Sequence, residues 1–308
     1  MPPDDLRNKY GADAFEAGLT LQPRTFEARV AERDSLDQHF TRLWLDFAIK
    51  GLGRRPALDT RTRLLVLIGQ YVMAKSHGAL EDTVRAAIAA AVPVREVLEI
   101  ILQCVVYGGH TTVEPAIKVF HRVADELGLL AGLRSTQLPL DGNDSTRSRE
   151  KESKTWHKDD VADPRFAGLM ERHGWLAVGR GLTMRPRHHL NILAWLDTMD
   201  PGFADLWVKF CYQGMYTRGI VDDKTRLLCM VGDCLAVGES TQAEGHMRGA
   251  MRQGAAPREV MEVIFQTAAN FGMPPMLHAL ESFVHIMAED GRLAEIGNPP
   301  RRVETFSK

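Results

Sequence analysis

The segment AEGHMRGA (243–250) presents a histidine in a pattern suited to acid–base chemistry. A similar segment, LEDTVRAA (80–87), lies in the first half of the chain and has Thr83 where the later segment has His246. An imidazole ionises near neutral pH and can therefore pass a proton to or from a substrate. On a helix, His246 lies one turn from both Ala243 and Ala250, and such small neighbours suit a side chain that lines a cavity. A half-buried structural histidine bonded to a backbone carbonyl explains the same pattern.

Two further side chains of the second half are candidates for the same site. His278 follows the turn NFGMPPM (270–276) by two residues and begins a helix, a position at which a histidine can be part of a helix cap. Asn270 has an amide that can donate a hydrogen bond to an enolate oxygen. The first half has Pro115 and Tyr107 at the two equivalent positions, so both candidates belong to the second half alone.

Arg226 is the cation best placed to bind an anionic substrate. Asp222 and Asp223 precede it by one helical turn, and an ion pair within the helix is the alternative interpretation. Arg63 occupies the equivalent position in the first half, where the histidine is absent, and this favours a structural role. Arg248 points nearly opposite to His246 on a helix, so we assign it to a salt bridge or a subunit contact.

No metal site, cofactor or thiol chemistry is predicted. The doublet His188–His189 has no further ligands at a metal-binding spacing. Most of the cysteines lie in apolar segments typical of buried thiols, and a disulfide framework is not expected in so large a chain. They form neither a C-x-x-C pair nor a metal-binding pattern with histidine: Cys104, Cys211, Cys229 and Cys234.

The elements that must position these residues form a tandem repeat. The segment from Phe40 to Phe120 matches the segment from Phe203 to Phe283 without gaps, in the register that also pairs Thr83 with His246. The alignment pairs FTRLWLDF (40–47) with FADLWVKF (203–210) and REVLEIILQ (95–103) with REVMEVIFQ (258–266). It also pairs two identical TRLL segments, at 62–65 and 225–228. A long match of this kind indicates two copies of one unit, which are too few for a solenoid. We therefore expect two units related by an internal pseudo-two-fold axis.

The repeated segments have helical periodicity. In TRLLCMVGDCLAVG (225–238) the apolar residues cover more than one helix face, as in an interior helix. In AAPREVMEVIFQTAANFG (255–272) Pro257 stands in the first turn, where its missing N–H costs nothing. No alternating pattern of convincing length predicts a strand. The predicted fold class is all-α.

The predicted organisation has four parts. Residues 1–134 form the first unit with a helical lead-in, and residues 161–296 form the second unit with its own lead-in. Residues 135–160 between them are polar beyond Leu140, apart from Trp156, and are expected to form a loose linker that does not order itself. Residues 297–308 are expected to be a loose tail.

Composition and charge exclude several classes of function. With 308 residues, a net charge of −2 and no basic stripe, the chain offers little attraction to nucleic acid. A superficial helix-turn-helix pattern at 246–266 has an acidic and apolar second helix, unlike a recognition helix. No apolar run is long enough to span a membrane, and the first residues lack the profile of a secretory signal. We therefore expect a cytoplasmic protein that does not bind membranes.

These segments, in this order, resemble the carboxymuconolactone decarboxylase family, an all-helical group that includes the alkylhydroperoxidase D proteins. The resemblance rests on TRLL (225–228), AEGHMRGA (243–250), PREVMEVIFQ (257–266) and NFGMPP (270–275), with their counterparts in the first half. It implies two tandem helical domains of the alkylhydroperoxidase D type. The peroxidase branch has a C-x-x-C before the motif histidine, where this sequence has Glu239 and Gln242, or Ser76 and Ala79 in the first half. An alkylhydroperoxidase-like antioxidant activity is therefore disfavoured, because no thiolate is available.

The decarboxylase branch has a histidine at the position of His246 and often another at that of His278. The resemblance implies a cofactor-free lyase of the 4-carboxymuconolactone decarboxylase type, acting on a small carboxylated lactone from aromatic compound catabolism. Loss of carbon dioxide leaves an electron pair that must move into a carbonyl group and then be protonated, which requires hydrogen-bond donors and a proton shuttle. Isomerisation or lactone hydrolysis in the same pocket remains an alternative, as does a non-catalytic small-molecule-binding or scaffold protein.

The same resemblance implies an assembly. Single-copy members of the family resemble trimers, or hexamers built from dimers, and a fused pair would supply one dimer per chain. We therefore predict a homotrimer that forms a pseudo-hexameric ring. A unit whose helices are apolar on more than one face also has surface to bury against a neighbour.

Overall fold

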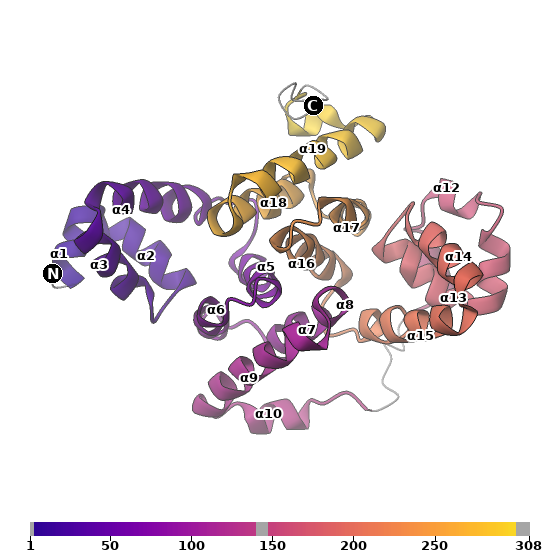
Figure 1. Ribbon diagram of the computed structural model, residues 1–308, viewed down its shortest axis with the longest axis horizontal. Coiled ribbons are helices and arrows are strands. Elements are labelled where there is room, and N and C mark those ends of the chain that lie inside the picture. The colour runs from indigo at the N-terminus through magenta and orange to yellow at the C-terminus, as the bar shows by residue number, and fades with distance from the viewer. Residues whose placement is uncertain (1–2, 140–146, 300–308) are drawn as a thin grey trace.

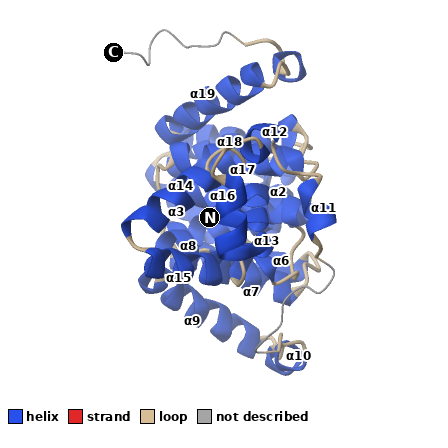
Figure 2. Ribbon diagram, turned by 90° about the vertical axis from the view of Figure 1, so that its right-hand side faces the viewer, coloured by secondary structure: helices blue, strands red, loops and turns tan. Residues whose placement is uncertain are grey.

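The computed structural model describes residues 3–139 and 147–299, and Figure 1 shows its helices in chain order. Within these residues every regular element is a helix, and none is a strand (Figure 2). The predicted all-α fold class is thus confirmed. None of the described helices is both long and apolar enough to cross a membrane.

The first half of the chain begins with four helices and a π-helix, which we call the first lead-in; the sequence repeat starts within it, at Phe40. Its elements are α1 (Pro3–Tyr10), α2 (Ala12–Leu21), α3 (Phe26–Leu36), α4 (Gln38–Trp44), the π-helix η1 (Leu45–Leu52), α5 (Thr60–Met73), α6 (His77–Ala89), α7 (Val94–Gln103), α8 (Val105–Gly108), α9 (His110–Glu126) and α10 (Leu130–Ser135).

The second half has the same plan, preceded by two short helices, and α18 begins at Pro257 as predicted. Its elements are α11 (Arg149–Ser153), α12 (Lys158–Val161), α13 (Phe166–Met184), α14 (His189–Met199), α15 (Pro201–Cys211), η2 (Met215–Thr217), α16 (Asp223–Ala236), α17 (Ser240–Arg252), α18 (Pro257–Phe271), α19 (Met273–Glu289) and η3 (Leu293–Ile296).

The helices of the second half repeat those of the first in the register of the sequence match. α5 and α16 each contain 14 residues, α6 and α17 each 13, and α9 and α19 each 17. The lead-ins repeat too, because α3 and α14 both contain 11 residues and GLTLQPR (18–24) returns as GLTMRPR (181–187). Gly11 separates α1 from α2, and Gly174 bends α13 at the equivalent place, both with positive φ. The duplication therefore extends beyond the match found in the sequence.

Both halves use the same signal to begin their central helices. Asp59 and Asp222 cap α5 and α16 by accepting hydrogen bonds from the backbone N–H groups of Thr62 and Thr225, at 2.8 and 2.9 Å. A cap of this kind contributes about 1 kcal/mol to helix stability. Because the cap fixes the first turn of each helix, it also fixes where the arginine after each threonine projects.

α5 and α16 cross at the centre of the molecule, where both are buried along almost their whole length (Figure 1). Gly69 and Gly232 allow this close approach. A Cβ atom at Gly69 would overlap the carboxylate of Asp233, and one at Gly232 would lie 2.9 Å from the side chain of Val66. Hydrophobic residues of both halves form one continuous core around the crossing. The two halves share this core, so the packing does not divide the chain into two separate bodies. The domain boundaries stay a prediction from the sequence.

Ion pairs are exchanged between the two halves. Arg63 on α5 lies 3.4 Å from Glu262 on α18, and Arg226 on α16 lies 2.8 Å from Glu99 on α7. Glu99 and Glu262 occupy equivalent positions, so each half offers its arginine to the glutamate of the other half. Such an exchange of contacts is what a two-fold relation between two units produces.

The two lead-ins lie at opposite ends of the molecule (Figure 1) and pack differently. The second lead-in joins the main core, to which it contributes Leu182, Met184 and Tyr212. The first lead-in instead has a small hydrophobic core of its own: Leu6, Tyr10, Phe15, Phe26, Val30, Leu45 and Ile49.

Part of the predicted linker is ordered. Residues 140–146 lie outside the described residues, but 147–160 contain α11 and α12. Trp156 is 8% exposed and packs its ring edge-on against Phe166, while the buried Glu152 pairs with Arg180 at 3.2 Å. The expectation of a loose linker was wrong for this part, because one aromatic ring and one buried ion pair supply contacts that the polar composition concealed. The predicted tail lies outside the described residues from 300 onward.

Candidate functional site

His246 lies on α17 with its side chain fully buried. Its Nδ1 is 3.0 Å from the carbonyl oxygen of Met184, the last residue of α13. Its Nε2 is 2.7 Å from the hydroxyl oxygen of Tyr107, which lies on α8 of the first half. Because a carbonyl oxygen only accepts, Nδ1 donates to Met184 and Nε2 accepts from Tyr107. Both ring nitrogens are therefore hydrogen-bonded to protein groups.

Burial keeps the His246 ring neutral. It lowers the pKa of His246 from 6.5 to about 3, and the nearby cation of Arg185 adds to this effect. The hydroxyl of Tyr107 also lies 3.2 Å from that of Tyr216, and burial raises the pKa of both phenols well above their usual value. A histidine with so low a pKa does not exchange protons near neutral pH. Proton transfer at His246 therefore requires this aromatic cluster to open.

Arg226, the predicted substrate-binding cation, is 1% exposed and faces the first half. One guanidinium nitrogen lies 2.8 Å from Glu99, and the other lies 3.1 Å from the amide oxygen of Gln103. Within the described residues, the expected ion pair with Asp222 or Asp223 is absent. The guanidinium instead turns toward the other half, where it forms a contact between the two copies.

The structure does not bring the other two candidates to His246. His278 is exposed on α19 and does not share the enclosed surroundings of His246. Asn270 lies on α18 and accepts a hydrogen bond at 2.8 Å from the hydroxyl of Tyr71, a residue of the first half. Arg248 pairs with Glu289, in agreement with its assignment to a salt bridge. His278 and Asn270 thus lie outside the buried surroundings of His246.

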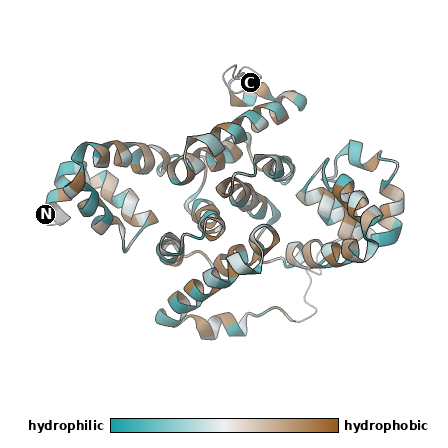
Figure 3. Ribbon diagram, in the orientation of Figure 1, coloured by the Kyte–Doolittle hydropathy of each residue, from teal (hydrophilic) through white to brown (hydrophobic). Residues whose placement is uncertain are grey.

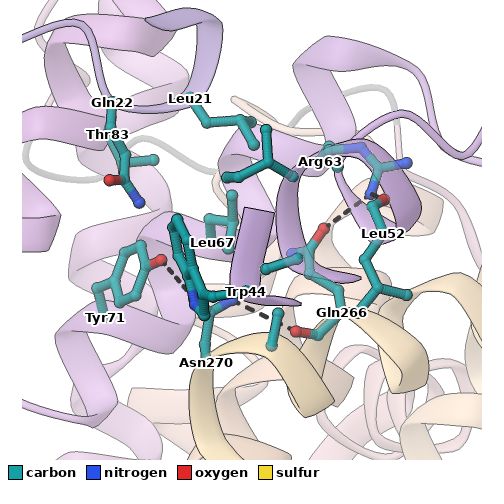
Figure 4. A pocket seen from close by; sticks show the side chains of 14 residues that line it. Leu21, Gln22, Trp44, Leu52, Arg63, Leu67, Tyr71, Thr83, Gln266 and Asn270 are labelled. Carbon is teal, nitrogen blue, oxygen red and sulfur yellow. Dashed lines mark hydrogen bonds between the residues drawn. The ribbon is translucent and has the colours of Figure 1, made fainter. Parts of the chain in front are cut away.

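A cavity of about 40 Å³ lies beneath the first lead-in (Figure 4). This space is sufficient for about two to four water molecules. Its walls come from the end of α2, from α4, η1, α5 and α6, and from α18 of the second half. The lining residues are Leu21, Gln22, Trp44, Ala48, Ile49, Leu52, Gly53, Arg63, Leu67, Tyr71, Thr83, Gln266, Ala269 and Asn270.

One wall of the cavity is polar and includes one buried donor that lacks an acceptor among the described residues. The buried amide of Gln266 accepts a hydrogen bond from Arg63 at 3.2 Å, and its Nε2 has no partner among the described residues (Figure 4). The hydroxyls of Tyr71 and Thr83 donate to Asn270 and to a backbone carbonyl of α6, both at 2.8 Å. A buried N–H group without an acceptor costs about 1–3 kcal/mol, so an acceptor atom of a ligand would relieve that cost.

No side chain that lines the cavity titrates near neutral pH. The lining contains no histidine, cysteine or carboxylate. Burial raises the pKa of Tyr71 to about 12. Burial also lowers the pKa of Arg63 from 12.5, although the carboxylate of Glu262 opposes this shift and keeps the guanidinium charged. The cavity can therefore bind and orient a ligand, but it holds no general acid or base tuned to neutral pH.

The cavity and the His246 cluster occupy equivalent places in the two halves. Each place combines both halves, since Tyr107 extends from the first half to His246 while Asn270 extends from the second half to the cavity. At two positions the second place has the larger side chain, since Tyr107 is equivalent to Asn270 and Tyr216 is equivalent to Gly53. The remaining equivalences pair Arg63 with Arg226, Tyr71 with Cys234, Thr83 with His246, and Gln266 with Gln103.

An open cleft of about 220 Å³ adjoins the cavity and shares Leu21, Gly53 and Arg63 with it. The side chains of Asp13 and Glu16 line its outer part. The π-helix η1 ends just before Gly53, and π-helical turns are rare and frequently occur at functional sites. This arrangement gives the cavity a route to solvent at the edge of the first lead-in.

Comparison with known proteins identifies the family. Residues 201–284 match the model of the carboxymuconolactone decarboxylase family. This chain belongs to that family. A relative from Paracoccus denitrificans, described as an uncharacterized 15.0 kDa protein in the nqo9-nqo10 intergenic region, is 36% identical over 97 residues, which are 31% of this chain and 69% of the relative. In this member of the carboxymuconolactone decarboxylase family, the matched range contains His246, whereas most of the cavity lining lies outside it.

Sequence reasoning missed the cavity of this family member. It named Asn270, but as a partner of His246, and it did not consider Tyr71 or Gln266. The necessary signal was the register of the repeat. Applied to Asn270 and Tyr107, it shows a small amide in one half where the other has a bulky ring. The register does not show that α18 of the second half lines the cavity of the first half.

Proposed function

We propose that this member of the carboxymuconolactone decarboxylase family binds a small ligand in the cavity of its first half. The observation that carries the proposal is the buried amide nitrogen of Gln266, which lines the cavity without a partner among the described residues. Arg63 adds a cation beside it, and Leu21, Leu67 and Ile49 contribute apolar walls. We expect a ligand with an apolar body and a carbonyl or carboxylate oxygen, such as a small carboxylated lactone.

The cavity in its present form is smaller than such a ligand, so binding requires the lead-in to move outward. The separate core of the first lead-in favours this motion, because the lead-in can shift as one body without breaking the main core. Closure of a lid over a small-molecule site is a common way to exclude water. The cleft that shares Leu21 and Gly53 with the cavity marks the side from which the ligand would enter.

The absence of a group that titrates near neutral pH from the lining favours binding over acid–base catalysis in this cavity. Proton return after loss of carbon dioxide needs a donor with a suitable pKa. The phenol of Tyr71, with its pKa raised to about 12, is a poor donor of that kind. The ligand would therefore be held rather than converted at this place.

Cofactor-free decarboxylation at His246 is the second candidate function. It is supported by the family match over residues 201–284 and by the 2.7 Å hydrogen bond that links His246 to a phenol. For this reaction Tyr107 and Tyr216 must move away, so that a carboxylated lactone can take their place. A rehydrated imidazole would then regain a pKa near neutrality and protonate the carbon that loses carbon dioxide.

Ligand binding can be tested by calorimetry with a panel of carboxylated lactones, aromatic carboxylates and their uncharged analogues. Asn270→Tyr copies the second half and fills the cavity, so we expect it to weaken binding at least about tenfold, the equivalent of roughly 1.4 kcal/mol. Tyr107→Phe is the matched control, because it changes the equivalent residue of the other place and should leave binding unchanged. Equal affinity of Asn270→Tyr and wild type would contradict the proposal.

The second candidate has a separate readout. Carbon dioxide release is measured with the same panel for wild type, His246→Gln and Thr83→Val. Release that His246→Gln abolishes and Thr83→Val retains would support catalysis at the second place. Binding without any release by the wild type would leave the binding function and exclude the lyase for these compounds.

A further inference from the structure

A second cavity, of about 280 Å³, lies where the ordered part of the linker meets the C-terminal ends of α17 and α19. It shares no lining residue with the cavity of the first half. Its volume is just below the range of about 300–1,000 Å³ that is typical of sites for drug-sized ligands, which suits a smaller molecule. Figure 3 shows hydrophilic segments around α12 and near the end of α19, at the periphery of the molecule. The lining residues are His157, Arg248, Met251, Arg252, Asp290 and Arg292.

Arg248 places a buried hydrogen-bond donor in the wall of this cavity. The residue is 7% exposed, and its guanidinium pairs with Glu289 and lies 4.0 Å from Asp290. Its Nε is buried as well and has no acceptor among the described residues. A buried N–H group without an acceptor is destabilising, and an acceptor atom of a ligand relieves that cost. Arg252 follows Arg248 by four residues and therefore lies on the same face of α17.

The other two arginines of the lining keep N–H groups that no carboxylate occupies. Arg252 contacts the backbone carbonyl oxygen of Thr155 at 3.5 Å and forms no ion pair among the described residues. Arg292 binds Glu295 through Nε and one terminal nitrogen, at 2.6 and 2.8 Å. Its other terminal nitrogen lies 4.0 Å from the sulfur of Met251. Since a guanidinium has five N–H groups and a thioether sulfur is a weak acceptor, several donors remain available to a ligand.

The positive charges around the cavity disfavour one another. Desolvation lowers the pKa of Arg252, and the neighbouring cations of Arg248 and Arg187 lower it further. The carboxylate of Asp290 opposes this shift without cancelling it. Desolvation and the cation of Arg252 also lower the pKa of His157. The C-terminal end of the α17 dipole, equivalent to about half a negative charge, compensates part of the Arg252 charge, and a bound anion would compensate the remainder.

The first half has no equivalent of this cluster of cations. In the register of the repeat, Ala89 and Leu129 occupy the positions of Arg252 and Arg292. The equivalent of Arg248 is also an arginine, and in the first half it pairs with two glutamates. The shared arginine therefore belongs to the fold of the repeated unit. The two added arginines are a feature of the second half alone, and the packing of the unit does not require them.

We propose that this cavity binds a small anion through a phosphoryl group. Guanidinium groups bind phosphoryl oxygens through paired, charge-assisted hydrogen bonds, and here they come from α17 and from the start of η3. A phosphoryl group presents three acceptor oxygens in different directions, so it engages donors on separate elements better than a planar carboxylate does.

The linker contributes a further donor to the site. Nδ1 of His157 accepts a hydrogen bond from the backbone N–H of Asp159 at 3.1 Å. The neutral ring therefore carries its proton on Nε2, where it can donate to an anion. Binding would thereby tie the ordered part of the linker to α17.

The proposal can be tested by calorimetry with inorganic phosphate, methyl phosphate and acetate at constant ionic strength, which keeps charge screening equal. We expect saturable binding of a phosphoryl compound to the wild type and weaker binding of acetate. Arg252→Ala and Arg292→Leu copy the first half and should each weaken phosphate binding at least about tenfold, the equivalent of roughly 1.4 kcal/mol. Arg258→Gln, at an exposed arginine of α18 outside the lining, is the matched control and should bind like the wild type.

The relative affinities identify the source of the phosphoryl group. Tighter binding of methyl phosphate indicates an organic phosphate ester, and tighter binding of inorganic phosphate indicates the free ion. The proposal is overturned if neither compound binds saturably, or if acetate binds as tightly as phosphate. Equal affinities of the wild type and both arginine variants would also overturn it, because the anion would then bind elsewhere. Circular dichroism checks that each variant keeps its helical content. The test is independent of the ligand proposed for the first half, because the two cavities are lined by different residues.

Discussion

The neutral, buried state of His246 makes a quantitative prediction about acid stability. The pKa of His246 is about 3 in the folded protein, and an imidazole in the unfolded chain has a pKa near 6.5. Below pH 6.5 the His246 imidazole therefore takes up a proton in the unfolded chain but stays neutral in the folded protein. The free energy of unfolding falls with decreasing pH by about 1.4 kcal/mol per unit, and between pH 7 and pH 5 this one residue accounts for about 2 kcal/mol.

Comparing the wild type with His246→Gln isolates this contribution. Burial also lowers the pKa of His189 to about 3 and raises that of Asp233 to about 8, but these groups are present in both proteins and cancel in the difference. Urea unfolding followed by circular dichroism at pH 7 and pH 5 should show that the variant loses about 2 kcal/mol less than the wild type. The slope against urea must stay equal in the two proteins, because a changed slope would indicate a different unfolding transition.

Equal losses of stability in the two proteins would refute this reasoning. So would a nuclear magnetic resonance titration in which the His246 ring protonates near pH 6.5. Either result means that water reaches the imidazole and that the cluster with Tyr107 and Tyr216 is already open in solution. The second candidate function would then gain support, because His246 would be available as a proton shuttle.

Two further predictions concern the helix crossing. Because the pKa of Asp233 is raised from 3.8 to about 8, the folded protein keeps a proton that the unfolded chain releases, so the free energy of unfolding falls as pH rises between these values. Asp233→Asn should flatten this slope of about 1.4 kcal/mol per pH unit in chemical denaturation. Gly69→Ala should destabilise the protein by about 1–3 kcal/mol, because the added carbon overlaps the Asp233 carboxylate. Gly78→Ala, where the added carbon meets nothing within 4 Å, should be neutral or slightly stabilising in the same denaturation experiment.

The fold class and the repeated helices followed from the sequence because both depend on local patterns. Helical periodicity and the position of Pro257 in a first turn depend on residues a few positions apart in the chain. The long ungapped match between the halves then indicated that one arrangement occurs twice. The repetition of the lead-ins escaped notice because they diverge outside GLTLQPR and GLTMRPR. The equal lengths of α3 and α14 and the equivalent positive-φ glycines Gly11 and Gly174 make the relation plain.

The state of the candidate site could not be derived in this way. Ala243 and Ala250 gave His246 small neighbours on its own helix, which suited a histidine that lines a cavity. The alternative, a structural histidine bonded to a backbone carbonyl, agrees with the hydrogen bond to Met184, although the ring is fully buried. The side chains that fill the space come from elsewhere, since Tyr107 belongs to the other half and Tyr216 to the short helix η2 before α16. Neither residue shows in the sequence that its ring will cover the imidazole. Packing between segments that are distant in the sequence determines that His246 is covered. The spacing of residues along one helix does not determine it.

The exchange of residues between the halves explains how one duplicated unit can have two different sites. The cavity of the first half is lined in part by α18 of the second half, and the His246 cluster of the second half includes Tyr107 on α8 of the first half. A substitution on α8 or α18 therefore alters the site of the opposite half. Tyr107 fills the second place without changing the first, and the smaller Asn270 leaves the first open without loosening the second. The filled place then contributes apolar burial to the shared core, and this offsets the unpaired donor that the open place retains. Divergence at a few equivalent positions, among them Tyr107 with Asn270 and Tyr216 with Gly53, therefore leaves one place filled and the other open.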